Sequence, residues 1–280
     1  LCGRICQYAR CCSSFDDSTV EAHPYLKTRL FMDENGDVLQ KRDDHLGYKT
    51  QILNDMNRET LVRPYMLFNE QLFRFEIYRT CNGNYLFLDI HHIIADGTSL
   101  ISIIEELWKL YKNKRAKKFH LEKQDFLDYA VWQDRYEDPT AKKQFFLDLF
   151  KDGVPENEIP IRTLRPEILP HATQVSREVL FDISKIEIAA RRLHISTALF
   201  MTVATSLTLA KYCDSEDLAL GMIMNGRTHP QTKQMVGMFV NSVPIRFKPK
   251  VNLTLAEYIT QSAAMFRGAL ENQTCPFELL

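Results

Sequence analysis

The chain has 280 residues, 45% of them hydrophobic and 25% charged, which is the composition of an ordinary globular protein with room for two lobes. The 35 Lys and Arg residues nearly balance the 36 Asp and Glu residues, giving a net charge of -1. This balance argues against a general affinity for polyanions, and we expect no nucleic-acid partner. No apolar run approaches the roughly 18 residues that a membrane helix needs, so we expect no membrane partner.

The seven cysteines are unevenly distributed, and Cys2, Cys6, Cys11 and Cys12 lie close to the N-terminus. An odd and uneven set argues against a disulfide framework and indicates a reducing compartment, so we expect a cytoplasmic protein. No histidine follows these four cysteines at zinc-binding spacing, and we expect no metal site there. Residues 1–21 are left unassigned. The densest basic stretch, at 112–118, is interpreted as a solvated helix end, with a docking surface for an acidic carrier protein as the alternative.

Alternation of apolar and polar residues predicts strands in the first half of the chain at 25–32, 38–41, 72–78 and 85–91. The Asn35-Gly36 pair predicts the turn between the first two strands, and residues 81–84 predict the turn between the last two. Apolar residues at helical spacing predict helices at 98–111, 125–137 and 139–150. Thr98 or Ser99 is the expected cap of the first of these helices.

Four prolines between residues 153 and 170 oppose both helix and inner strand, so we place an inter-lobe linker at 153–172. Beyond the linker the pattern predicts a strand, two helices, two strands and a helix, at 174–181, 184–193, 196–212, 218–224, 238–247 and 254–270. Because strands and helices interleave on both sides, we predict an α/β fold with an N-terminal lobe at 22–152 and a C-terminal lobe at 173–280.

The motif His91-His92-Ile93-Ile94-Ala95-Asp96-Gly97 lies where a buried strand ends and a helix begins. Side chains at such a junction are well placed to contact substrate, because the strand and the helix on either side hold them in position. An imidazole titrates near about 6.5 and an α-amino group near about 7.7–8.0, so a neutral histidine accepts a proton from an attacking amine near neutral pH. Adjacent strand residues point to opposite faces, which predicts one working and one structural histidine.

Two other interpretations of this motif are open at this point. A pair of histidines often packs in a core. His92 and Asp96, four residues apart, would be placed to bind a metal if they lay on a helix. Gly97 and the strand-like run before His92 argue against a helix there, and we expect no metal site.

Residues His91 to Ser99 (HHIIADGTS) resemble the HHxxxDG motif of the condensation domains of nonribosomal peptide synthetases. Other acyltransferases of the chloramphenicol acetyltransferase-like fold share this motif. Further segments resemble those of the condensation domains in the same order, at 128–133 (DYAVWQ), 236–246 (VGMFVNSVPIR) and 272–278 (NQTCPFE), with a weaker match at 23–29 (HPYLKTR). The ordered set narrows the resemblance from the superfamily to the condensation domains.

The resemblance implies an α/β (α+β) fold of two chloramphenicol acetyltransferase-like lobes, arranged as a V-shaped pseudodimer. It covers about residues 22–280 of the chain. The family's first helix motif is not found, and the family continues beyond the segment that 272–278 resembles. We therefore expect a domain truncated at both ends.

The resemblance also implies a function, namely amide bond formation between a donor acyl thioester and an acceptor aminoacyl thioester. Both substrates would be carried on the phosphopantetheine arms of separate carrier domains, with no cofactor bound directly. The implied partners are the upstream and downstream peptidyl carrier domains and adjacent synthetase domains such as an adenylation domain. His92 would face a tunnel between the lobes and contact the reacting amine, and His91 would be structural.

Four further residues would support the site. Asp96 would turn away from the tunnel and pair with Arg227 of the other lobe, the alternative being that Arg227 is a surface residue on a turn. Gly97 would leave room for close approach of backbone or substrate. Asn241 would lie on a strand beside the site, with a hydrogen bond in the core as the alternative.

Several rival functions share the histidine motif. A coenzyme-A-dependent or wax-ester-synthase-like acyltransferase is disfavoured by the segments at 128–133 and 236–246. An epimerization domain would have an acidic, Gly- and His-rich stretch from which residues 225–230 depart, and a heterocyclization domain would have aspartates in place of the two histidines. An inactive, truncated remnant is the last alternative, against which the intact motif argues.

Overall fold

The computed structural model describes residues 4–6, 16–45, 47–48, 50–112, 124–160, 175–178 and 181–280. The chain forms two compact units, and each is discontinuous in the sequence. The first comprises Leu1–Glu137 and Asn225–Val240, and the second comprises Asp138–Met224 and Asn241–Leu280. The sequence predicted one boundary between the lobes, at a linker over 153–172, but that range falls within the second unit. Residues 161–172 of it lie outside the described part of the chain.

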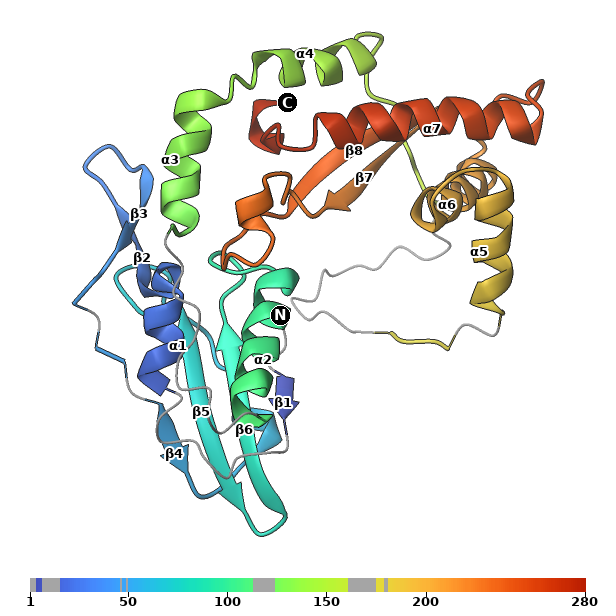
Figure 1. Ribbon diagram of the computed structural model, residues 1–280. Coiled ribbons are helices and arrows are strands. Elements are labelled where there is room, and N and C mark those ends of the chain that lie inside the picture. The colour runs from blue at the N-terminus through green and yellow to red at the C-terminus, as the bar shows by residue number, and fades with distance from the viewer. Residues whose placement is uncertain are drawn as a thin grey trace. The chain divides into compact units, whose positions relative to one another are not determined.

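The first unit is built on a four-stranded sheet with the strand order β1-β6-β5-β4 (Figure 1). These strands are β1 Arg4–Cys6, β4 Gln51–Leu53, β5 Phe73–Thr80 and β6 Gly83–Ile90. β5 and β6 pair antiparallel with Phe73 opposite Ile90, whereas β4 runs parallel to β5. The hairpin predicted around residues 81–84 is therefore present.

The described residues of the first unit form the helices α1 Asp16–Ala22, α2 Gly97–Lys112 and α3 Phe126–Tyr136. α2 lies beside the β5–β6 hairpin in Figure 1. The two-residue period of a strand turns Phe73 and Phe75 toward one face, where they join Leu100 and Ile103 of α2 in a buried core. Val236 from the later segment of the unit is fully buried in the same core.

A separate hairpin consists of β2 Thr28–Met32 and β3 Val38–Arg42. Its predicted turn is present, with Gly36 in the left-handed region at φ 88°. The strand begins only at Thr28, because Pro24 starts a 3-10 turn over Pro24–Lys27 that replaces the first part of the expected strand. Other 3-10 turns lie at Arg58–Thr60, Pro230–Thr232 and Phe277–Leu279.

The second unit is built around an antiparallel ribbon of β7 Leu218–Met224 and β8 Asn241–Phe247, in which Met224 lies opposite Asn241. Its helices are α4 Thr140–Leu149, α5 Ile183–Arg192, α6 Thr197–Cys213 and α7 Leu255–Glu271. α7 runs along the ribbon in Figure 1. The buried core joins both strands to α4, α6 and α7 through Phe146, Val203, Leu218, Ile245 and Ile259. α4 therefore contributes to this core.

Two further predicted strands differ from the structure. Within the expected strand at 174–181, residues 175–178 have no regular structure, and residues 174, 179 and 180 lie outside the described part. Val175 is 80% exposed, so the alternating pattern there does not reflect burial. β8 begins at Asn241 and not at Met238, because residues up to Val240 belong to the first unit.

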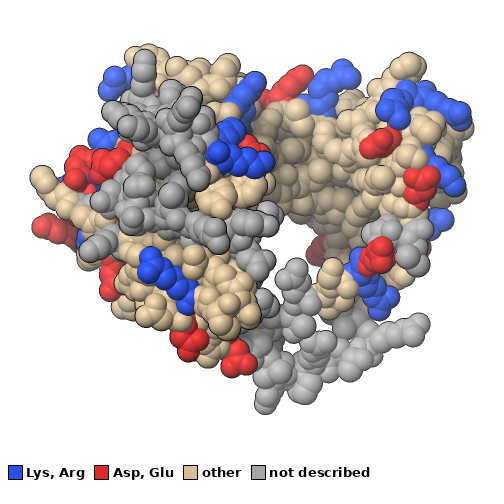
Figure 2. Space-filling view, turned by 60° about the horizontal axis from the view of Figure 1, so that its bottom comes forward, with Lys and Arg blue, Asp and Glu red and all other residues tan. Residues whose placement is uncertain are grey.

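No single helix among the described residues is both long and apolar enough to cross a membrane. The pair α5 and α6 passes that test only when its two helices are taken together, and the pair is bent by 99°. Figure 2 shows that basic and acidic side chains are interspersed over the visible face, without a continuous field of either sign.

Candidate functional site

The two histidines of the motif lie just past the end of β6, and His91 is held in place. Its backbone N–H donates to the carbonyl of Leu72 at 2.8 Å, and its Nδ1 accepts from the N–H of Ile93 at 3.2 Å. The ring of Tyr65 meets the imidazole edge-on, with 5.6 Å between ring centroids. Burial lowers the pKa of His91, and the neighbouring charge of His92 acts in the same direction. His91 therefore favours the neutral form, in which Nδ1 carries no proton.

His92 has a different environment, although it is the next residue. Its side chain is exposed, and within the described part of the chain no group hydrogen-bonds to its ring. Ile94 and Ala95, which come after Ile93 in the chain, are both buried. The short turn is thus anchored on either side of His92 while the imidazole of His92 itself remains accessible.

Asp96 is fully buried and caps α2. Its Oδ1 accepts from the N–H of Ser99 at 2.7 Å, and its carbonyl accepts the first helical N–H, from Leu100, at 3.1 Å. Its Oδ2 accepts from the N–H of Phe239 at 3.3 Å. The expected cap, Thr98 or Ser99, is therefore wrong: the helix begins one residue earlier, at Gly97, and the preceding aspartate satisfies its free amide.

Arg227 pairs with Asp96, as the resemblance implied. One nitrogen, Nη2, donates to both carboxylate oxygens at 2.8 and 2.9 Å, so the contact is not the two-nitrogen fork. Nη1 donates to the carbonyls of Thr232 and Met235, and the guanidinium lies 4.1 Å from the ring centroid of Phe239. The Arg227 side chain is only 4% exposed, which excludes the surface-residue alternative. The expectation that Arg227 belongs to the other lobe is wrong, because the returning segment Asn225–Val240 places both partners in the first unit.

Two glycines allow close packing of the segment that carries Arg227, one against the segment itself and one against α3. Gly226 has φ 69°, and a Cβ there would lie 1.9 Å from the carbonyl oxygen of Phe239. A Cβ on Gly237 would lie 2.4 Å from a ring carbon of Phe126. Gly97 differs from both, because a Cβ there would meet no atom within 4 Å. The space around Gly97 is open, and its role in close approach of backbone or substrate stays a prediction.

Asn241 lies in the second unit, at the start of β8. Its Nδ2 donates to the carbonyls of Gln273 and Cys275 at 2.8 and 2.6 Å. The Nζ of Lys142 donates to Thr274 Oγ1 at 2.6 Å in the same loop. Asn241 therefore fixes the loop of the 272–278 segment, which corresponds to the hydrogen-bonding alternative.

Two residues that the sequence analysis did not assign to the site contribute to the geometry of the histidine turn. Ser99 is fully buried and bonds to Asp96, Arg227 and Gly237, and Tyr65 contacts His91. A polar residue in the first turn of an apolar helix was a usable signal for Ser99, which was interpreted only as a cap. Tyr65 lies in a stretch without regular structure and carried no such signal.

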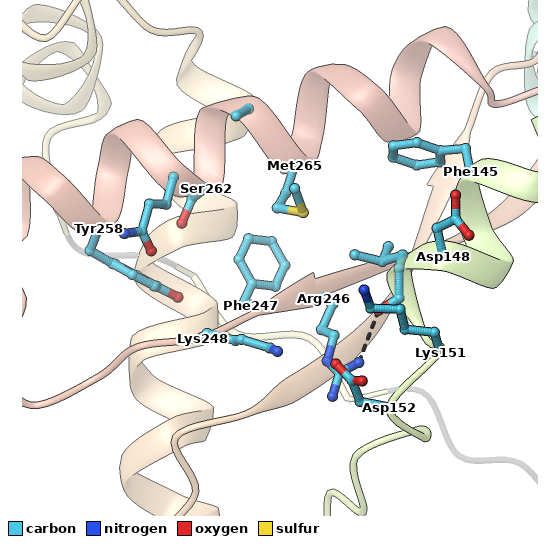
Figure 3. A pocket seen from close by; sticks show the side chains of 13 residues that line it. Phe145, Asp148, Lys151, Asp152, Arg246, Phe247, Lys248, Tyr258, Ser262 and Met265 are labelled. Carbon is cyan, nitrogen blue, oxygen red and sulfur yellow. Dashed lines mark hydrogen bonds between the residues drawn. The ribbon is translucent and has the colours of Figure 1, made fainter.

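A pocket of about 580 Å³ is lined by residues of the second unit (Figure 3). Phe247 and Met265 supply apolar surface, and Lys151, Asp152 and Lys248 lie at its charged side in Figure 3. No residue of the histidine motif lines it. Among the described residues, no group of three or more His, Cys, Asp and Glu side chains is placed to hold a metal ion.

A family model described as "Condensation domain" matches residues 14–280. The chain belongs to the condensation domain family. It is 30% identical over 278 residues to gramicidin S synthase 2 of Aneurinibacillus migulanus and 27% identical over 274 residues to bacitracin synthase 1 of Bacillus licheniformis. These matches cover 94% and 93% of this chain but only 6% and 5% of those proteins. The condensation domain therefore spans a small fraction of the curated relatives it matches.

Solved structures confirm the fold of the condensation domain. The condensation domain from the Monacolin K polyketide synthase MokA aligns with a TM-score of 0.75 at 18% identity, over 99% of this chain and 69% of that one. The first condensation domain of the CDA synthetase aligns with a TM-score of 0.70 at 18% identity, over 93% and 66%. The mixed helix and sheet architecture is thus that of the chloramphenicol acetyltransferase-like fold, as predicted.

Proposed function

We propose that the chain is the condensation domain of a nonribosomal peptide synthetase and that it forms an amide bond between two carrier-bound substrates. The observation that carries this proposal is the pair of adjacent histidines with unlike environments, one anchored and one accessible. The family match and the relatedness to synthetases of peptide products support the substrate class. Since the matched region is a small fraction of those synthetases, the carrier and adenylation domains would lie in other parts of such a protein.

In the proposed reaction, the amine nitrogen of the acceptor attacks the carbonyl carbon of the donor thioester. The accessible imidazole of His92 takes the proton that the amine loses as the C–N bond forms, and then returns it to the sulfur as the C–S bond breaks. The products are the amide on the acceptor carrier and the free thiol of the donor arm, so no proton or electron is left over. General base catalysis of this kind contributes about 10²–10⁴-fold, and positioning of the two substrates supplies further acceleration.

The surrounding residues would prepare His92 for this role. Asp96 is occupied by Arg227, Ser99 and Phe239, so its carboxylate acts on the shape of the turn and not on the substrate. Both substrates would arrive on phosphopantetheine arms, and the domain itself would bind no cofactor. We also infer a cytoplasmic location, which the uneven cysteine content supports.

The experiment is an amide-forming assay with donor and acceptor substrates loaded on carrier domains, using the domain within its native synthetase. His92→Ala is expected to remove most product formation, and His45→Ala, which changes another exposed histidine of the first unit, is expected to leave it unchanged. Near-normal turnover by a folded His92→Ala variant would rule out the catalytic role.

A second donor in the same assay distinguishes the condensation domain from a coenzyme-A-dependent acyltransferase. A donor presented as a coenzyme A thioester should be used much less well than the same acyl group on a carrier domain. Preference for the coenzyme A thioester would favour a coenzyme-A-dependent acyltransferase. Absence of product with either donor would favour the inactive alternative.

A further inference from the structure

We propose that Ser99 is a positioning residue, whose hydroxyl holds the histidine turn in the geometry that His92 needs. The expected effect of Ser99 on the reaction rate rests on the proposed function. Ser99 lies in the first turn of α2, is 0% exposed and cannot reach substrate. Its effect on the reaction would therefore pass through Asp96 and the turn that ends there.

The Ser99 hydroxyl uses its full hydrogen-bonding capacity. Its oxygen accepts from the N–H of Gly237 at 3.0 Å and from Nη2 of Arg227 at 2.9 Å. Its single proton has two acceptors at 2.8 Å, Oδ1 of Asp96 and the carbonyl of Gly237. The Gly237 carbonyl also accepts from the N–H of Asp96 at 3.2 Å. A hydroxyl has one donor and two acceptor sites, so this environment fills all three.

The hydroxyl has a task distinct from capping. Asp96 caps α2 through the backbone N–H of Ser99, and an alanine at this position would keep that bond. What alanine would lose is the side-chain link from the helix start to the peptide of Gly237, 138 positions further along the chain, leaving the N–H of Asp96 as the remaining bond to that peptide. The N–H of Gly237 would then be buried without its partner, and one N–H of Arg227 would lose an acceptor.

The turn containing His92 depends on this link at its far end. At its near end, His91 is fixed to Leu72 and Ile93. At its far end, Asp96 is fixed by the group to which Ser99 belongs. The imidazole of His92, by contrast, makes no hydrogen bond within the described residues, so its position follows from the turn that carries it. Loss of the Ser99 hydroxyl would loosen the far end, which Arg227 and the N–H of Phe239 still hold, while leaving both histidines in the chain.

The test compares Ser99→Ala with Ser206→Ala in the native synthetase. Ser206 is a matched control, since it is also 0% exposed on a helix and bonds to the carbonyl of Val203 and the hydroxyl of Tyr258, all in the second unit. Both variants should lose thermal stability. Only Ser99→Ala should lower kcat, on the order of 10-fold, with KM for both carriers within about two-fold, because a displacement near 1 Å can cost 10²-fold in rate. A kcat for folded Ser99→Ala equal to that of the wild type would overturn the proposal.

An NMR readout keeps the test independent of the assigned reaction. The imidazole signals of His92 should shift in Ser99→Ala and return toward the wild type in Ser99→Thr, which keeps a hydroxyl, while the signals of His45 stay fixed. Unchanged His92 signals would overturn the positioning role even if activity fell. Shifted His92 signals, together with full activity of His92→Ala, would support positioning and contradict the proposed function. If Ser99→Ala fails to fold, Ser99→Cys replaces it in both measurements, with the same expected direction.

Discussion

A single nitrogen of Arg227 lies within 2.9 Å of both carboxylate oxygens of Asp96, and the two side chains are 4% and 0% exposed. Removal of one partner of such a pair strands the other charge away from water, at a typical cost of about 3–5 kcal/mol. Asp96→Ala and Arg227→Ala should each lower the free energy of unfolding by about this amount, which is a large part of the roughly 5–15 kcal/mol of a typical protein.

The double variant should be less damaged than the sum of the two single variants, because the second substitution removes the stranded charge. Urea denaturation of all four proteins measures this coupling. Asp44→Ala is the control, since Asp44 pairs with Arg42 at the surface, where such pairs contribute about 0–1 kcal/mol. Strict additivity of Asp96→Ala and Arg227→Ala would contradict a functional ion pair.

Gly226→Ala should destabilise the first unit by more than about 1 kcal/mol, because its backbone is left-handed and the new Cβ would overlap the carbonyl of Phe239. Gly97→Ala is the matched control: it has open space around the new Cβ and lies at the start of a helix, which alanine favours. Thermal unfolding of both variants measures the difference. An equal shift in Tm for the two would show that the segment at 225–240 relaxes to accept a side chain.

The free energy of unfolding should fall as the pH drops below neutral, because His91 takes up a proton more readily in the unfolded chain than in the folded one. Burial lowers its folded pKa below the unfolded value of about 6.5, so between the two values the unfolded chain binds more protons. The contribution is fully present above about 6.5 and is lost as the pH falls through that value toward the folded pKa. His91→Asn removes the titration and keeps an acceptor for the N–H of Ile93. The difference in unfolding free energy between wild type and His91→Asn should shrink from pH 7.5 to 5.5, and a difference that grows over this range would have the wrong sign.

Asn241 offers a test in the second unit. Asn241→Ala removes two hydrogen bonds to the carbonyls of Gln273 and Cys275, for an expected loss of about 1–3 kcal/mol. Asn241→Asp should cost more, although it is closer in shape, because a carboxylate would then face two carbonyl oxygens. Urea denaturation ranks the variants, and greater stability of Asn241→Asp than of Asn241→Ala would contradict the observed amide orientation.

The sequence predicted the local elements well because their signals are local. The alternation along β5 and the helical spacing along α2 each reflect burial on one face. The same rule failed at 174–181, where an alternating pattern lies on exposed Val175. The cap of α2 was misassigned because Asp96, Thr98 and Ser99 are all suitable caps, and only the true start of the helix distinguishes them.

The long-range contacts of the site could not be predicted from patterns of residues along the sequence. The contact between Asp96 and Arg227 was predicted only through the resemblance, since no periodicity links positions 131 apart. The partner of the Ser99 hydroxyl is the backbone of Gly237, which has no side chain to signal a contact. The division into units was missed for a related reason, because Asn225–Val240 lies between two strands of the second unit in sequence but belongs to the first.

This interrupted order of the two units has a consequence for synthesis on the ribosome. The first unit cannot be completed when its first 137 residues have emerged, because Arg227 and Gly237 are still to be made. At about 5–20 residues per second, the carboxylate of Asp96 waits roughly 7 to 26 s for its partner, 131 positions later. The nascent first unit must therefore persist with a buried charge unpaired, or stay open at that point, until both strands that flank the returning segment can form.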